Sequence, residues 1–267
     1  HAMSNFSFAL RDSATMLRRD IQHSLRRLSM TLSGLLVPII MLVLFVYVFG
    51  GAIGASLGGM ALGGSYINFV APGIIIMTVG SGCATTAINL CMDMSEGIIA
   101  RFRTMAISRS SVLTGQVLGS LIRTMLGVCL IIGVALLMGF RPTANPVAWL
   151  AALGLIALLT LAITWMGVAF GLVGKTPAGA NSLSLIFQLL AFTSSAFVRP
   201  DSMAGGVRWF AEYQPFSPVI DTLRGLLLGT PIGGSTVALA VAWCVCLTLL
   251  GYLWARTAYN RSSVSAS

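Results

Sequence analysis

Six long apolar runs dominate this sequence and restrict what it can fold into. Each approaches the roughly 20 residues that an α-helix needs to cross the hydrocarbon core of a bilayer. Backbone polar groups inside a bilayer must bond to one another, so such runs form helices. The sequence therefore predicts an all-α polytopic membrane protein with six transmembrane helices, at approximately 33–50, 68–92, 118–139, 147–174, 180–198 and 235–255.

The composition excludes a soluble enzyme. Apolar residues make up 57% of the 267 and charged residues only 9%, whereas a soluble domain carries roughly 25% charged residues. The net charge of +9 does not indicate nucleic-acid binding, because the basic residues occur in small groups between the apolar runs, as in loops that set membrane topology or contact anionic lipid. The five cysteines lie in or beside apolar runs, so we expect buried free thiols and no metal site.

The distribution of Lys and Arg predicts the orientation. If the N-terminus is cytoplasmic, eleven basic residues lie on that side, four lie on the other side, and Arg123 lies inside the third run. Basic residues concentrate on the cytoplasmic side, so both termini are expected in the cytoplasm. The eleven are Arg11, Arg18, Arg19, Arg26, Arg27, Arg101, Arg103, Arg109, Lys175, Arg256 and Arg261; the four are Arg141, Arg199, Arg208 and Arg224.

An amphipathic helix is expected before the first run. Apolar residues at Met16 or Leu17, Ile21, Leu25 and Leu28 recur at spacings of three or four, which is typical of a helix that lies along a membrane surface. An ordinary solvated helix is the alternative. The basic residues of this interfacial helix are Arg18, Arg19, Arg26 and Arg27.

The chain is expected to form a single transmembrane domain. Residues 1–3 resemble the remnant of an expression tag and are left out of it. The segment 199–234 is too rich in charge and proline to cross the membrane simply, so we predict short external or re-entrant helices there. The domain, 4–267, comprises an interfacial helix at 4–32, a six-helix core at 33–255 and a cytoplasmic tail at 256–267.

No catalytic constellation can be assembled from this sequence. It contains no Ser/His/Asp set, paired carboxylates or metalloprotease motif. Gly174-Lys175-Thr176 resembles the end of a Walker A loop, but Ala169 occupies the position of its first glycine, and a helix is expected before it instead of a strand. We therefore expect neither an ATP site nor a bound cofactor in this chain. No carboxylate lies in mid-span, which argues against proton- or sodium-coupled transport.

The segment 93–109 carries the most specific motif. It contains Glu96-Gly97, continues into a short predicted helix with Arg101-Phe102-Arg103, and ends at Ser108-Arg109. This pattern resembles the cytoplasmic coupling loop of ABC-2 type exporter permeases. The stretch from Gln214-Pro215-Phe216 to Arg224-Gly225 is similar to the external segment between the last two spans in the daunorubicin-resistance branch of that family.

The resemblance implies a permease without ATPase activity, which pairs with a separate nucleotide-binding subunit that holds ATP and Mg²⁺. With a second copy or a related permease, it would export an amphipathic drug, antibiotic or lipid-like molecule across a bacterial inner membrane. A basic turn that contacts only lipid is the alternative for the loop, and a non-transporting scaffold, a regulatory subunit or an ion channel for the protein. The resemblance assigns contact with the ATPase to Glu96, Gly97, Arg101, Phe102, Arg103 and Arg109.

Two sets of polar residues recur at helical spacing within apolar runs. Polar groups are costly in hydrocarbon, so these are candidates for the export pathway or for the contact between two permeases; ordinary helix packing is the alternative. Gly167, Gly171 and Gly174 predict a packing face, whereas Arg123 either extends toward the cytoplasmic surface or faces the subunit interior. The two polar sets are Thr78, Ser81, Thr85 and Asn89, and Asn181, Ser184, Gln188 and Ser195.

Overall fold

The computed structural model describes residues 28–50, 66–95, 109–197 and 204–264, apart from the side chains of 28–33, 109–112 and 260–264. Within these ranges the chain is helical and contains no strand, which confirms the predicted all-α class. The elements are α2 (Leu28–Leu44), η1 (Phe45–Phe49), α4 (Tyr66–Ser95), α6 (Arg109–Leu137), α7 (Pro146–Val173), α8 (Pro177–Phe192), α9 (Gly205–Tyr213), α10 (Phe216–Leu228) and α11 (Gly234–Val264).

Each of the six apolar runs overlaps a helix, although the first overlaps both α2 and η1 and the fifth continues beyond the end of α8 at Phe192. Four helices are long and apolar enough to cross a membrane: Tyr66–Ser95, Leu113–Leu137, Pro146–Val173 and Gly234–Tyr259. The apolar stretches Gly34–Phe49 and Pro177–Phe192 are shorter. At 1.5 Å per residue, the 16 residues of α8 rise about 24 Å, less than the roughly 30 Å of a hydrocarbon core. Six membrane crossings therefore remain a prediction.

The sequence sets the starts of α7 and α8 in the same way. Before α7, the Ala148 N–H donates to the Asn145 side chain at 2.9 Å, and Pro146 occupies the first helical turn. Before α8, the Gly179 N–H donates to Thr176 Oγ1 at 3.1 Å, and Pro177 follows. Both are ordinary N-caps. Thr176, the last residue of the tripeptide that resembles a Walker A loop, therefore caps α8, and the element before this tripeptide is the helix α7 and not a strand.

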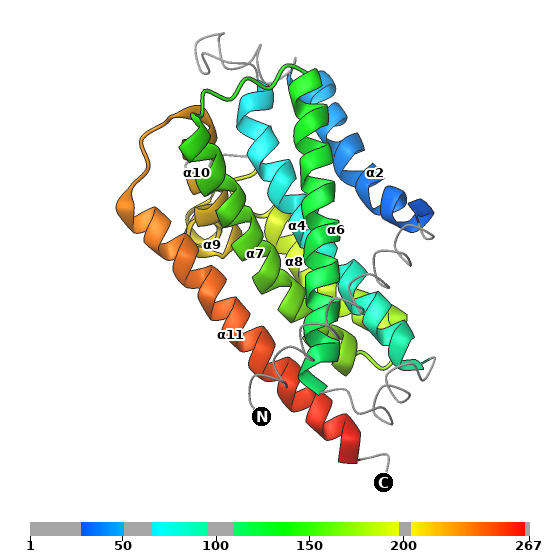
Figure 1. The fold of residues 1–267 in the computed structure, drawn as a ribbon. Helices are drawn as coiled ribbons and strands as arrows, with labels where there is room; N and C mark the ends of the chain where they lie inside the picture. The colour runs from blue at the N-terminus through cyan, green and yellow to red at the C-terminus, as the bar shows by residue number, and fades with distance from the viewer. Residues whose placement is uncertain (1–27, 51–65, 96–108, 198–203, 265–267) are drawn as a thin grey trace.

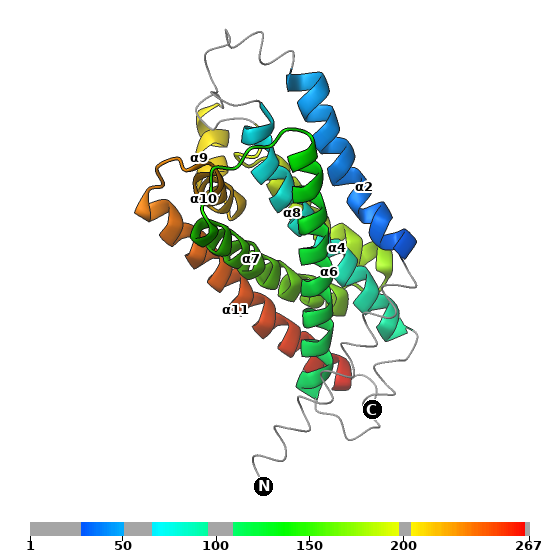
Figure 2. The same cartoon turned by 45° about the horizontal axis from the view of Figure 1, so that its top comes forward.

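Helix α4 lies at the centre of the bundle. It packs against α2, α6, α7, α8 and α10, and 19 of its 30 residues are buried. In Figure 1, α2 lies on one side of the bundle (blue) and α11 on the opposite side (orange to red), with α4, α6 and α7 between them; Figure 2 shows the same order. Helix α2 begins and α11 ends toward the same end of the bundle in Figure 1.

The packing face predicted from glycines on α7 is confirmed. A Cβ added at Gly167 would lie 2.9 Å from the carbonyl oxygen of Cys83, and one at Gly171 would lie 2.8 Å from that of Ala87. Real Cβ atoms do not approach so closely, so α7 and α4 can pack at this separation only with glycine at both positions.

Replacing Gly171 by valine is expected to destabilise the fold by about 1–3 kcal/mol, the usual cost of overpacking. The matched control is Gly154→Val on the same helix, because a Cβ at Gly154 meets nothing within 4 Å. Thermal unfolding of both variants in mild detergent measures the difference. Equal losses of stability would mean that the cost lies in the β-branched side chain and not in the α4–α7 contact.

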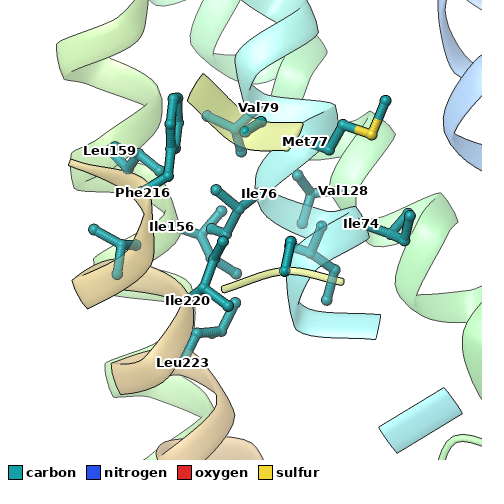
Figure 3. Close-up of a cluster of buried hydrophobic side chains, with 14 of the residues drawn as sticks. Ile74, Ile76, Met77, Val79, Val128, Ile156, Leu159, Phe216, Ile220 and Leu223 are labelled. Atoms are coloured by element: carbon teal, nitrogen blue, oxygen red, sulfur yellow. The ribbon is translucent and has the colours of Figure 1, made fainter. Parts of the chain in front are cut away.

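The segment between α8 and α11 contains two short helices, α9 and α10. Nine of the 13 residues of α10 are buried, and Figure 3 shows Phe216, Ile220 and Leu223 of α10 in one apolar cluster with Ile76 of α4 and Ile156 of α7. Gly229, in the left-handed region with φ of 69°, ends α10. Two short helices therefore lie in this segment and α10 is buried in the bundle, while their external or re-entrant placement remains a prediction.

Candidate functional site: polar residues between the helices

A pocket of about 50 Å³ lies between α2, α4 and α6, and its lining combines hydroxyl side chains and Arg123 with glycine and leucine. The helices that form its walls approach each other closely at two glycines. A Cβ at Gly82 of α4 would lie 2.8 Å from Thr124 Oγ1 of α6, and one at Gly127 of α6 would lie 2.8 Å from Leu35 of α2. The lining residues are Gly34, Leu35, Thr78, Ser81, Gly82, Thr85, Ser120, Arg123, Thr124 and Gly127.

The hydroxyls from α4 at this pocket donate to their own helix. Thr78 Oγ1 donates to the Ile74 carbonyl at 2.9 Å, and Ser81 Oγ to the Thr78 carbonyl at 2.7 Å. The Thr85 hydroxyl makes a longer contact of 3.4 Å with the Ser81 carbonyl. Bonds of this kind leave the oxygen lone pairs available as acceptors, and a hydroxyl can rotate to donate to a bound group.

The structure brings together three of the four polar residues predicted on the second run. Thr78, Ser81 and Thr85 line the pocket, whereas Asn89 is half-buried and is not part of the lining. Arg123 lines the same pocket between helices, which supports the alternative that it faces the subunit interior. Ser120 is also buried here, and its hydroxyl bonds to that of Thr86.

The polar set predicted on the fifth run does not form one helical stripe, and that prediction is wrong for Ser195. Helix α8 ends at Phe192, and Thr193 follows as its C-cap, so Ser195 lies beyond the helix. Ser184 is buried against α4, where the Cys83 thiol contacts Ser184 Oγ at 3.7 Å. Asn181 and Gln188 are half-buried, and no member of this set lines the pocket formed by α2, α4 and α6.

Arg224 of α10 is the centre of a second polar cluster, which sequence reasoning missed. Its Nη1 donates to Asp221 Oδ1 at 3.0 Å, and its Nη2 donates to the carbonyl oxygens of Phe69 and Ser195 at 3.1 and 3.0 Å. The guanidinium carbon lies 4.1 Å from the centroid of the Phe69 ring. The side chain of Arg224 is only 16% exposed, although the sequence suggested nothing more than an external basic residue. The one local signal was Asp221, three residues earlier in the helix.

Ser195 completes this cluster. Its hydroxyl donates to Asp221 Oδ1 at 2.9 Å, and its backbone N–H donates to Ser217 Oγ at 3.1 Å. Burial raises the pKa of Asp221, and the Arg224 charge and the Ser195 hydroxyl oppose that rise. The cluster therefore joins α4, the residues after α8 and α10 in one hydrogen-bonded unit.

The proposed coupling residues lie at the connection between α4 and α6. Helix α4 ends at Ser95 and α6 begins at Arg109, whose side chain is not described. Gln116 Nε2 donates to Asp93 Oδ2 at 3.3 Å and so joins the two helices beside this connection. Outside the described residues lie Glu96, Gly97, Arg101, Phe102 and Arg103, and likewise Arg18, Arg19, Arg26 and Arg27 of the interfacial helix.

Metal chemistry finds no support in the part of the chain that the structure describes, where no three His, Cys, Asp or Glu residues come together. The five cysteines are free thiols, of which Cys83, Cys91 and Cys244 are buried and Cys129 and Cys246 are exposed on the helices. The expectation that all five thiols are buried is therefore wrong for Cys129 and Cys246.

Comparison with known proteins places the chain among transporters. It is 29% identical over 196 residues to the Daunorubicin resistance ABC transporter permease protein DrrB1 of Streptomyces coeruleorubidus, covering 73% of this chain and 67% of that protein. It is 24% identical over 225 residues to the Probable doxorubicin resistance ABC transporter permease protein DrrC of Mycobacterium tuberculosis, covering 84% and 81%. It is also 24% identical over 222 residues to the Putative transport permease ycf38 of Porphyra purpurea, covering 82% and 74%.

The family described as ABC-2 type transporter matches residues 12–228. This range includes every described helix from α2 to α10, together with the connection that carries the coupling motif. Family members are transport subunits and not enzymes themselves. The chain belongs to the ABC-2 type transporter family and is similar to its drug-resistance permeases.

Proposed function

We propose that this chain is the transmembrane permease subunit of an ATP-driven exporter that moves an amphipathic drug, antibiotic or lipid-like molecule out of a bacterial cell. The observation that carries the proposal is the family match over 12–228, which includes the coupling motif between α4 and α6. The names of two relatives, which refer to daunorubicin and doxorubicin resistance, support the choice of an amphipathic cargo.

The energy source in this proposal is a separate nucleotide-binding subunit that holds ATP and Mg²⁺. The residues 96–109 bind that subunit, with the interfacial helix 4–32 beside them, and a second permease copy or a related permease completes the pathway. Closure of the ATPase subunits on ATP moves the permease halves as rigid bodies. Both termini are cytoplasmic, a placement supported by α2 beginning and α11 ending toward the same end of the bundle.

Co-expression with an ABC ATPase subunit from the same organism tests the proposal. We expect the two proteins to purify as a stable complex in mild detergent, with an ATP turnover that differs from that of the ATPase alone. An ATPase variant that cannot hydrolyse ATP provides the background rate. If the chain associates with neither this ATPase nor any other, the exporter proposal fails and a scaffold or regulatory role takes its place.

A further inference from the structure

A second apolar cluster lies apart from the main core of the bundle. It draws its residues from four helices, α4, α6, α7 and α11. The α4 members come from the last two turns of that helix, and the buried α6 members come from the first three turns. The cluster therefore lies at the two helix ends that the connection between α4 and α6 joins. Its buried residues are Leu90, Leu113, Val117, Val168, Ala169, Ala255 and Tyr259, with Met94, Leu161, Trp165 and Leu172 partly buried beside them.

One face of α11 is buried as far as Tyr259, near the end of this helix. Gly251, Ala255 and Tyr259 recur every four residues and are buried, whereas Arg256 and Thr257 are exposed. Residues at this spacing lie on one face of a helix. Figures 1 and 2 both show the last turns of α11 beside the first turns of α6. The buried face of α11 therefore reaches the helix that follows the connection.

The three residues on this face differ in size. A Cβ added at Gly251 would lie 2.8 Å from the backbone nitrogen of Met166, so a small residue is needed there for α11 to approach α7. Tyr259, by contrast, is the largest of the buried residues in the cluster and is only 6% exposed. An aromatic ring buries a large apolar area, and removing it from between packed helices leaves a cavity.

A polar contact joins the same two helix ends but is the weaker link. Gln116 Nε2 of α6 donates to Asp93 Oδ2 of α4 at 3.3 Å, a long and only partly buried hydrogen bond. Such a bond contributes little once its exchange with water is counted. The spacing between the end of α4 and the beginning of α6 therefore depends mainly on the apolar cluster, of which Tyr259 is the largest buried member.

We propose that Tyr259 is a positioning residue for the coupling of ATP hydrolysis to export. Its ring holds the end of α4 and the beginning of α6 at a fixed spacing, so that a displacement arriving from the ATPase moves both helices together. The fixed spacing is a property of this chain alone, whereas the coupling role rests on the proposed function. The family match ends at residue 228, before α11 begins at Gly234, so it assigns no role to Tyr259.

Hydrogen–deuterium exchange of the purified chain in mild detergent, without any ATPase, tests the fixed spacing. Tyr259→Ala should speed amide exchange in residues 90–95 and 113–117 by about fivefold or more, because these helix ends open more often without the ring. The matched control is Leu247→Ala, because Leu247 also lies on α11 and is 7% exposed but belongs to the main core. Unchanged exchange in Tyr259→Ala, or an equal increase at these residues in both variants, would overturn the proposal.

The number of molecules exported per ATP hydrolysed tests the coupling role. In vesicles that contain the complex with the ATPase, Tyr259→Ala should lower this ratio about fivefold while the complex still forms. Tyr259→Phe keeps the ring and should retain the wild-type ratio. Leu247→Ala should reduce export and ATP turnover in proportion, because a general loss of stability only lowers the amount of active protein. A wild-type ratio in Tyr259→Ala, or an equal fall in Leu247→Ala, would contradict the coupling role.

The two measurements separate this proposal from the proposed function. If the wild-type chain forms no complex with an ATPase, the proposed function is refuted, and the exchange measurement still decides whether Tyr259 fixes the spacing of the helix ends. If the complex forms and exports, but Tyr259→Ala changes only the exchange and not the export per ATP, the coupling role of Tyr259 is refuted and the proposed function stands.

Discussion

Replacing Arg101 and Arg103 together by glutamate is expected to abolish ATP-driven export, with at least a tenfold loss of transport, while the protein stays folded in the membrane. The family resemblance places both arginines in the segment that binds the ATPase, where reversing two charges replaces attraction by repulsion across the contact. ATP turnover of the co-purified complex and uptake of a fluorescent amphiphile into inverted vesicles measure the effect.

The matched control is the double variant Lys175→Glu and Arg256→Glu. These two residues are exposed, and the predicted orientation places them on the same side of the membrane, so the control carries the same change of charge. We expect it to retain most of its transport. Normal transport by the Arg101 and Arg103 variant would remove the coupling assignment, and equal losses in both double variants would mean that overall charge on that side matters and not this loop.

Replacing Arg224 by methionine is expected to lower the free energy of unfolding by about 3 kcal/mol, the lower end of the range for breaking a buried ion pair. The lower end applies because Asp221 is 43% exposed and is partly screened by solvent. The change removes the donors to Asp221 and to the carbonyls of Phe69 and Ser195. Thermal and denaturant unfolding in detergent measure the loss.

Arg208→Met is the control for this prediction. Arg208 Nε donates to Glu212 Oε1 at 2.8 Å within α9, and the two side chains are 46% and 37% exposed. An exposed pair of this kind contributes about 0–1 kcal/mol, so little change in stability is expected. A loss for Arg224→Met as small as that for Arg208→Met would show that the cluster does not hold α10 in the bundle.

Local sequence pattern predicts the approximate positions of the long helices and part of the pocket lining. Apolar runs located six helices because burial in lipid or protein requires long uninterrupted apolar stretches, and the spacing of Thr78, Ser81 and Thr85 placed them on one face. The end of α8 was misjudged, because Ser195 still fits the helical spacing although the helix has ended at Phe192.

Contacts between distant residues were beyond such reasoning. Arg224 binds the carbonyl of Phe69, 155 residues away, and nothing near Arg224 in the sequence identifies that partner. In the same way, the sequence shows Arg123 as a charged residue inside an apolar run. It does not show that residues of α2 and α4 form a pocket beside Arg123. Residues 96–108 of the coupling motif lie outside the described residues.

The burial of α4 has a consequence for how work could pass through this subunit. The connection proposed to receive the ATPase is joined directly to the C-terminal end of α4, the helix with the most neighbours. A displacement there cannot bend or slide α4 alone, because its close contacts with α7, α8 and α10 would be lost. The force would instead move α4, α7, α8 and α10 together as one rigid body. The helices that change position relative to this group during an alternating cycle would be the less tightly packed ones at its edge, above all α2.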